Sequence, residues 1–246
     1  MPAPGPGGGP QVAYVDITGD GVRGPLDVLW DVRFELAAPV RSFGSFRGQR
    51  SFQGSWWFAT TGAHVGFESW VERDHVMLLD FDPDVVGVSS QPFWLSWTGQ
   101  DGAARRHAPD YFARCRDGSA VVIDVRPDER VGPDDEQVFA ATAAACAGVG
   151  WGYRRVGAVD SVFAANVRWL AGYRHIRCLN PEFAARLLEQ FCAATSLADA
   201  VARAGDRLAV LPTLFHLIWT GVLTADLRSG PLTSNTPLGR AGLRAA

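Results

Sequence analysis

Residues 107–126, HAPDYFARCRDGSAVVIDVR, constrain the fold of this chain more than any other stretch. Two runs of strand-forming residues flank an Asp-Gly pair at Asp117 and Gly118, which is a strong signal for a β-hairpin. The hairpin would bring Asp110, which follows a proline, near Asp124, which interrupts an apolar run. A carboxylate in a buried strand is costly unless it is paired or binds a metal. The sequence therefore predicts oxygen donors at one edge of a sheet, the chemistry of a magnesium-dependent phosphodiesterase.

Further segments around this hairpin follow in a definite order. Residues 67–92 contain an expected helix with acidic residues and then a Gln-Pro pair, and the hairpin adds Pro-Asp and Asp-x-Arg on successive strands. This ordered set resembles the restriction-endonuclease-like superfamily, whose signature is Pro-Asp followed, on the next strand, by Asp or Glu, any residue and Lys. The more specific resemblance is to TnsA-type endonuclease subunits of heteromeric cut-and-paste transposases. With the residues after Asn180, it covers about two thirds of the chain.

The resemblance implies a metal site formed by residues of these segments. Asp110 and Asp124 would hold Mg²⁺ or Mn²⁺, and Glu68 would contribute from a helix expected over residues 67–80. A metal of this kind lowers the pKa of a bound water and offsets the charge of the scissile phosphate. Glu72 lies one helical turn beyond Glu68, and we expect it to be a surface glutamate.

Arg126 departs from the family pattern. It stands where the family has its lysine, and all 23 basic residues of the chain are arginine. Arginine keeps the positive charge but does not act as a general base, and its planar head positions a water differently. Two interpretations stay open. Either lysine has drifted to arginine throughout an active enzyme, in which Arg126 stabilises the transition state, or the site has decayed and the fold survives for DNA binding or assembly.

The resemblance also implies an activity and partners. A TnsA-type subunit cuts the 5′ strands at transposon ends, while a partner transposase of the DDE type cuts the 3′ strands. Double-stranded DNA is the implied substrate, and an AAA+ ATPase regulator is a further implied partner. Two other functions stay open: a catalytically decayed subunit that serves DNA binding or transposase assembly, and a stand-alone nuclease for defence or repair.

Residues 41–62 interleave arginines with aromatic residues, and the glycines among them predict loops. Such a segment suits contact with nucleic acid, with arginines on phosphates and aromatic rings near bases or sugars. The alternative is an aromatic segment packed on the core, with its arginines solvated. Together with two polar residues nearer to the expected metal site, the candidates for DNA contact are Arg41, Arg47, Arg50, Gln91 and His107. The histidine is equally suited to a structural role.

Composition limits the remaining functions. The formal net charge of −3 and a pI near 5.9 are not typical of a nucleic-acid-binding chain, so any DNA contact must come from local arginine patches. No apolar run is long enough for a membrane span, so none is expected. The four cysteines have no Cys-x-x-Cys spacing, which predicts reduced thiols in a cytoplasmic protein rather than a zinc site.

Strand and helix signals alternate through most of the chain, which predicts an α/β fold with a mixed central sheet flanked by helices. In this restriction-endonuclease-like arrangement we expect a disordered tail over residues 1–11 and a nuclease-like domain over residues 12–178. Three helical segments and two short strands around Ser229 and Gly230 then predict a winged-helix-like domain over residues 179–246.

The third helix of that last domain offers few polar side chains for reading the major groove. The outward positions that we expect on it are Arg207, Thr213, His216 and Thr220. We therefore expect a docking surface for a protein partner, or weak contact with the DNA backbone, in place of sequence-specific recognition.

Overall fold

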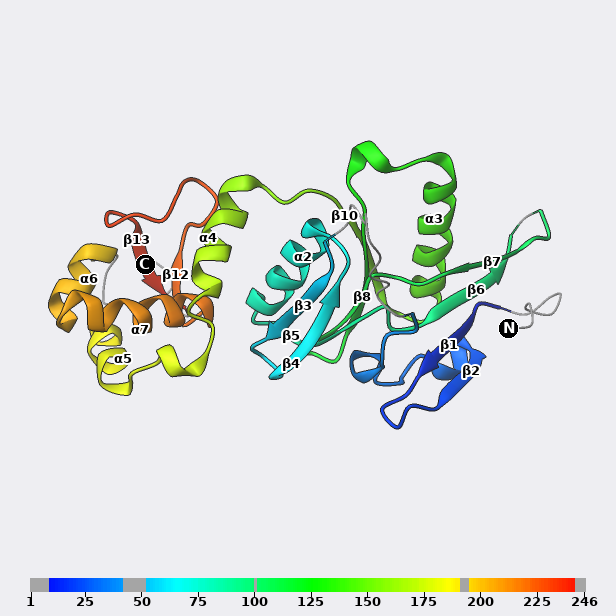
Figure 1. Cartoon of the computed structure of the whole chain (residues 1–246). Helices are drawn as coiled ribbons and strands as arrows, with labels where there is room; N and C mark the ends of the chain where they lie inside the picture. Colours follow the sequence, from blue (N-terminus) through cyan, green and yellow to red (C-terminus); the bar gives the residue numbers. More distant parts are fainter. Residues whose placement is uncertain (1–8, 42–51, 100, 191–194, 242–246) are drawn as a thin grey trace. The chain divides into compact units, whose positions relative to one another are not determined.

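The computed structural model of the chain consists of two compact units, each built from helices and strands (Figure 1). Unit 1 comprises residues 1–79 and 84–158, and unit 2 comprises residues 80–83 and 159–246. The presence of helices and sheets in both confirms the mixed α/β class expected from the sequence. Within these units, the structure describes residues 9–41, 52–99, 101–190 and 195–241.

A four-stranded mixed sheet forms the centre of unit 1. Its strands are, in spatial order, β10 (Gly152–Val156), β9 (Ala120–Val125), β8 (Tyr111–Cys115) and β5 (Val85–Ser90). β8 pairs with β5 and with β9 in antiparallel fashion, whereas β9 and β10 are parallel. The expected hairpin is confirmed: Tyr111 lies opposite Ile123, and Gly118 in the turn adopts a φ of 86°.

A second four-stranded sheet of unit 1 consists, in spatial order, of β2 (Gly21–Pro25), β1 (Gln11–Val15), β6 (Trp94–Thr98) and β7 (Ala104–His107). β5 and β6, which only three residues separate, therefore belong to different sheets. Gln91 separates them with a positive φ of 47°, and Pro92 has no N–H to donate to a sheet. Gln11, expected in the disordered tail, begins β1.

Helices and a further hairpin cover the two faces of the central sheet (Figure 1). α2 (Trp70–Phe81) and the hairpin of β3 (Gly54–Phe58) and β4 (Ala63–Phe67) pack in one apolar cluster with Tyr111 and Ile123. α3 (Pro133–Gly148) packs in a second cluster with Phe112 and Val122. Because side chains alternate along a strand, these clusters occupy opposite faces of the sheet. Short elements of unit 1 are α1 (Leu26–Leu29) and the 3₁₀ turns Phe34–Leu36 and Asp128–Arg130.

α2 begins at Trp70 and not at Phe67, which is the last residue of β4. Ser69 caps the helix, since its Oγ accepts a hydrogen bond from the Glu72 N–H at 3.2 Å. In return, Glu72 accepts hydrogen bonds from the Ser69 hydroxyl at 2.8 Å and from the Glu68 N–H at 2.7 Å. This reciprocal capping is a variant of the capping box, because its main-chain donor is Glu68, the residue before the cap, and it leaves Glu68 before the helix rather than on it.

Unit 2 combines helices with a small sheet. Its helices are α4 (Ser161–Ala171), α5 (Pro181–Leu188), α6 (Leu197–Ala204) and α7 (Arg207–Trp219), with a 3₁₀ turn at Ile176–Cys178. The three strands are, in spatial order, β11 (Thr195–Ser196), β13 (Pro237–Arg240) and β12 (Leu223–Ala225). No helix among the described residues of the chain combines the length and apolar character needed to cross a membrane.

α4 belongs to unit 2, although it precedes the boundary expected after residue 178. Asn166 of α4 gives the physical reason. Its buried Nδ2 donates hydrogen bonds to the carbonyls of Leu227 at 2.9 Å and Gly230 at 2.8 Å. Its Oδ1 accepts one from the Leu232 N–H at 2.9 Å. These bonds attach the segment between β12 and β13 to α4.

The C-terminal half of α7 is buried, which corrects two of its expected outward positions. Thr213 donates to the Cys178 carbonyl and accepts from the Asn180 N–H, both at 3.0 Å. His216 Nδ1 lies 2.9 Å from the Tyr173 carbonyl. Both polar side chains are therefore internal partners of main-chain groups, and Arg207 and Thr220 stay exposed.

Candidate functional site

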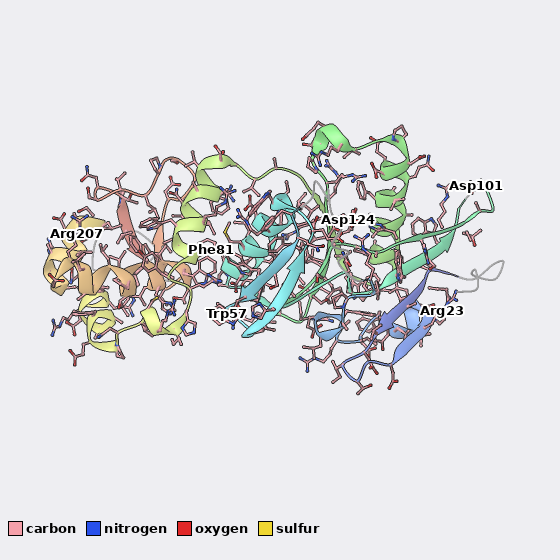
Figure 2. All side chains as sticks on the ribbon, in the orientation of Figure 1. Arg23, Trp57, Phe81, Asp101, Asp124 and Arg207 are labelled. Carbon is pink, nitrogen blue, oxygen red and sulfur yellow. The ribbon has the colours of Figure 1, made fainter. Side chains whose placement is uncertain are left out.

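A pocket of about 370 Å³ in unit 1 gathers charged residues from several elements. Its acidic lining residues are Glu68, Glu72, Asp110, Asp124 and Asp135. Its basic and histidine lining residues are Arg41, Arg106, His107 and Arg126. Asp124, labelled in Figure 2, lies in the interior of unit 1 and is only 1% exposed. A set of carboxylates thus shares one pocket with several arginines.

The register of β8 and β9 brings Asp110 and Asp124 together at the end of the hairpin. The Val125 N–H, adjacent to Asp124, donates a hydrogen bond to Asp110 Oδ2 at 2.7 Å. Asp124 Oδ1 lies 2.8 Å from His107 Nε2, and its Oδ2 accepts from the Tyr153 hydroxyl at 2.9 Å. Both oxygens of the buried Asp124 carboxylate are therefore hydrogen-bonded, as burial requires.

Asp110 experiences the excess of negative charge in the pocket. Enclosure raises its pKa well above the ordinary value, and the charges of Glu72 and Asp124 raise this pKa further. The hydrogen bond from Val125 and the positive charge of Arg41 act in the opposite direction without cancelling the shift. An acid in such surroundings favours its neutral form unless a cation balances the neighbouring charges.

Glu72 is the acid of α2 that acts on Asp110, and it is not the surface glutamate expected from the sequence. Apart from enclosure, its charge is the largest influence raising the pKa of Asp110. Burial also raises the pKa of Glu72 itself. Glu68 lines the same pocket, but its Oε2 forms an ion pair with Arg41 Nη2 at 2.6 Å.

Arg126 follows β9 and lines the same pocket. Its Nη2 donates to Asp135 Oδ1, in the first turn of α3, at 2.8 Å. Asp135 Oδ2 also accepts from the Gly132 N–H at 3.0 Å, so this acid caps α3 as well as holding Arg126. The Arg126 side chain is 45% exposed, which leaves its guanidinium accessible to a ligand entering the pocket.

The residues expected to contact DNA fall into three groups. Arg41 is exposed and His107 half-buried at the pocket, although Glu68 and Asp124 already pair with them. Gln91 is 2% exposed, and its Oε1 has no hydrogen-bond partner among the described residues. A surface contact between Gln91 and DNA is therefore not available in this conformation. The other two candidates, Arg47 and Arg50, lie outside the described residues.

Sequence reasoning did not single out Glu72 as a site acid, and it missed Asp135 and Arg106 in the pocket lining and Tyr153, which donates a hydrogen bond to Asp124. A signal for Glu72 existed, because Ser69-x-x-Glu72 has the spacing of a capping box and marks the helix start. Tyr153 has no local signal. It reaches Asp124 because β10 pairs in parallel with β9, which a long crossover through α3 makes possible.

The chemistry of the donor set suits a hard divalent cation. Asp110, Asp124 and Glu72 offer only oxygen atoms, which Mg²⁺ and Mn²⁺ prefer. Such a cation would also neutralise the negative charges of Glu72 and Asp124 around Asp110. Within the part of the chain that the structure describes, no group of three His, Cys, Asp or Glu side chains already has metal-binding geometry. The hydrogen bonds of Asp124 to His107 and Tyr153 hold both of its oxygens.

No protein-family model matches the chain, and a comparison with curated proteins finds no match either. A functional assignment therefore rests on the pocket of unit 1. Its carboxylates can bind a cation and its arginines can bind an anion, and both meet in one space. This combination suits a reaction on a phosphate ester.

Proposed function

We propose that unit 1 has a restriction-endonuclease-like arrangement and that the chain is the metal-dependent endonuclease subunit of a heteromeric transposase. It would cleave the 5′ strands of double-stranded DNA at transposon ends. The observation that carries the proposal is the group of Asp110, Asp124 and Glu72 in one pocket, where burial and then the neighbouring negative charges raise the pKa of Asp110. The order of the motifs along the chain supports the proposal further: Glu72 of α2 comes first, then Pro109-Asp110, then Asp124-x-Arg126.

In this proposal Asp110, Asp124 and Glu72 hold Mg²⁺ or Mn²⁺. When bound, the cation supplies a water of lowered pKa and offsets the charge on the scissile phosphate. Tyr153 orients Asp124 through the hydrogen bond to its Oδ2. Glu68 contributes less directly, because it balances the charge of Arg41 at the wall of the pocket.

Arg126 has the role of stabilising negative charge that develops on the phosphate in the transition state. Its half-exposed guanidinium would exchange Asp135 for a phosphate oxygen when DNA binds. A guanidinium binds such oxygens in a bidentate manner, although it does not take up a proton as a general base would. Asp135 then acts as a resting partner that keeps Arg126 beside the pocket.

For unit 2 we propose a winged-helix-like domain that binds protein partners: the DDE-type transposase subunit and the AAA+ regulator. The order α5, β11, α6, α7, β12 and β13, with the paired β12 and β13, supports this arrangement. The internal bonding of Thr213 and His216 removes two polar groups from the surface of α7. Few side chains of α7 then remain for base recognition.

Nicking of supercoiled plasmid by the purified full-length protein with Mn²⁺ tests the endonuclease. We expect the wild type to nick, and we expect EDTA to stop it. Asp110→Asn and Glu72→Gln should each lower the rate at least roughly a hundredfold. Asp134→Asn is the matched control, because this exposed acid of α3 does not line the pocket. If Asp110→Asn nicks as fast as the wild type, the pocket is not the site of the reaction.

A second candidate function is a catalytically decayed subunit for DNA binding or transposase assembly. The hydrogen bonds that occupy both oxygens of Asp124 favour it, as does an arginine at the position of the family lysine. The two candidates separate when the wild type is assayed together with its partner subunits. Cutting by the partner alone, with 5′ strands intact at every metal concentration, would support the decayed subunit.

A further inference from the structure

The mouth of the pocket contains an arginine that the proposed reaction does not yet use. Arg106 of β7 and Trp94 of β6 both line the pocket. The Arg106 guanidinium carbon lies 4.6 Å from the centre of the Trp94 ring. Arg106 is opposite Ser96 in the antiparallel pair, so Trp94 is its diagonal neighbour on the same face. The aromatic ring thus holds the guanidinium in place at the pocket while the arginine stays exposed.

Arg106 differs from the other arginines nearby because no carboxylate in the described part of the chain forms an ion pair with it. Arg41 is paired with Glu68 at 2.6 Å, and Arg126 with Asp135 at 2.8 Å. Among the described residues, no carboxylate lies within 4.0 Å of the Arg106 guanidinium, which packs against the Trp94 ring. Its N–H donors therefore remain available to an anion.

The acidic residues that line the pocket give an unpaired cation a use in binding a nucleic-acid substrate. The carboxylates repel a phosphate backbone, and the net charge of the chain, −3, gives no general attraction. A strand that enters the pocket needs a fixed positive charge at the rim. A guanidinium stacked on an aromatic ring meets this need, since it is oriented before the phosphate arrives.

We propose that Arg106, held by Trp94, binds a backbone phosphate of duplex DNA beside the scissile one and positions the strand over the carboxylates. The proposal rests on the proposed nuclease function for its substrate class. It adds a DNA contact that is separate from the carboxylates and from Arg126. Arg105 does not share this role, because strand alternation places it on the other face of β7, where it pairs with Asp101 at 2.7 Å.

Binding of the full-length protein to a fluorescein-labelled DNA duplex tests the contact. Anisotropy is measured in EDTA, so that no cutting occurs, at salt concentrations from about 50 to about 200 mM. The association constant falls with salt concentration, and loss of one phosphate contact makes the slope of log K against log salt concentration less steep by about 0.9. For Arg106→Gln, the affinity deficit relative to the wild type should therefore shrink about three- to fourfold across this range. Arg106→Lys should keep the wild-type slope, because it keeps the charge.

Arg105→Gln is the matched control, and it should bind with the wild-type slope. The proposal is overturned if Arg106→Gln keeps that slope, or if the slope of Arg105→Gln becomes less steep by as much as that of Arg106→Gln. It is also overturned if the wild type does not bind the duplex. A failure of the endonuclease proposal is recognised separately. In that case the wild type does not nick plasmid with Mn²⁺, yet Arg106→Gln still shows the reduced salt slope.

Discussion

Replacing Arg126 by alanine should separate a catalytic role from a structural one. The side chain forms an ion pair with Asp135 at 2.8 Å, but the two side chains are 45% and 30% exposed. An ion pair that is this accessible to water contributes at most about 1 kcal/mol to stability. The main-chain bonds of Arg126, to Val156 and Arg155, do not depend on its own side chain. Arg126→Ala should therefore fold normally.

The expected effect on activity is larger than the effect on stability. Loss of one group that stabilises charge in the transition state costs roughly a hundredfold in rate, about 2.7 kcal/mol. Nicking of plasmid with Mn²⁺ should fall by at least this factor in Arg126→Ala, while the urea midpoint changes little. Arg126→Lys should keep or raise the rate, because lysine restores a compact charge that also orients water.

Two further variants serve as controls for Arg126. Asp135→Asn weakens the same ion pair from the other side but keeps the cation, so its nicking rate should fall much less than that of Arg126→Ala. Arg130→Ala removes an exposed arginine that does not line the pocket, and it should change neither rate nor stability. If Arg126→Ala cuts as fast as the wild type, Arg126 is only a partner of Asp135 and its catalytic role is refuted. If the wild type is inactive with its partners and Arg126→Lys restores cutting, the site has decayed at this position.

Three other variants test the structure around the site and in unit 2. The pKa of Asp110 is raised in the folded chain, so its ionisation destabilises the fold as pH rises above the unfolded value of about 3.9. Without metal, Asp110→Asn should therefore need more urea to unfold than the wild type at neutral pH, and equal midpoints at neutral pH would contradict this. Tyr153→Phe removes a hydrogen bond to the buried Asp124 carboxylate, and urea unfolding should show a loss of about 1.5–3 kcal/mol. Asn166→Ala removes three hydrogen bonds, worth about 1 kcal/mol each, and amide exchange of residues 227–232 should accelerate. Unchanged exchange there would argue against this anchor.

Local sequence signals identified much of unit 1. The Asp-Gly turn predicted the β8–β9 hairpin, and the hairpin brings Asp110 near Asp124. The apolar periodicity extends back to Phe67 and predicts an earlier helix start than the capping residue Ser69 allows. The sequence therefore predicted Glu68 on the helix, whereas Glu68 precedes α2 and Glu72 lies within it, and both line the pocket.

Other features depend on distant parts of the chain, and no local pattern contains them. The break at Gln91 separates two sheets, but a run of alternating residues on both sides of it reads as one strand. Tyr153 meets Asp124 only through the parallel pairing of β10 with β9. In unit 2, Asn166 bonds to residues more than sixty positions later, so α4 could not be assigned to that unit from the sequence.

Calorimetric titration of Mn²⁺ into the full-length protein with duplex DNA present tests the central claim most directly. A cation held by Asp110, Asp124 and Glu72 predicts a saturable heat of binding for the wild type. Asp110→Asn and Glu72→Gln should abolish or greatly weaken it, whereas the exposed-acid control Asp134→Asn should bind like the wild type. No Mn²⁺ binding by the wild type, or equal binding by Asp110→Asn, would contradict the claim that this pocket is the metal site of an endonuclease.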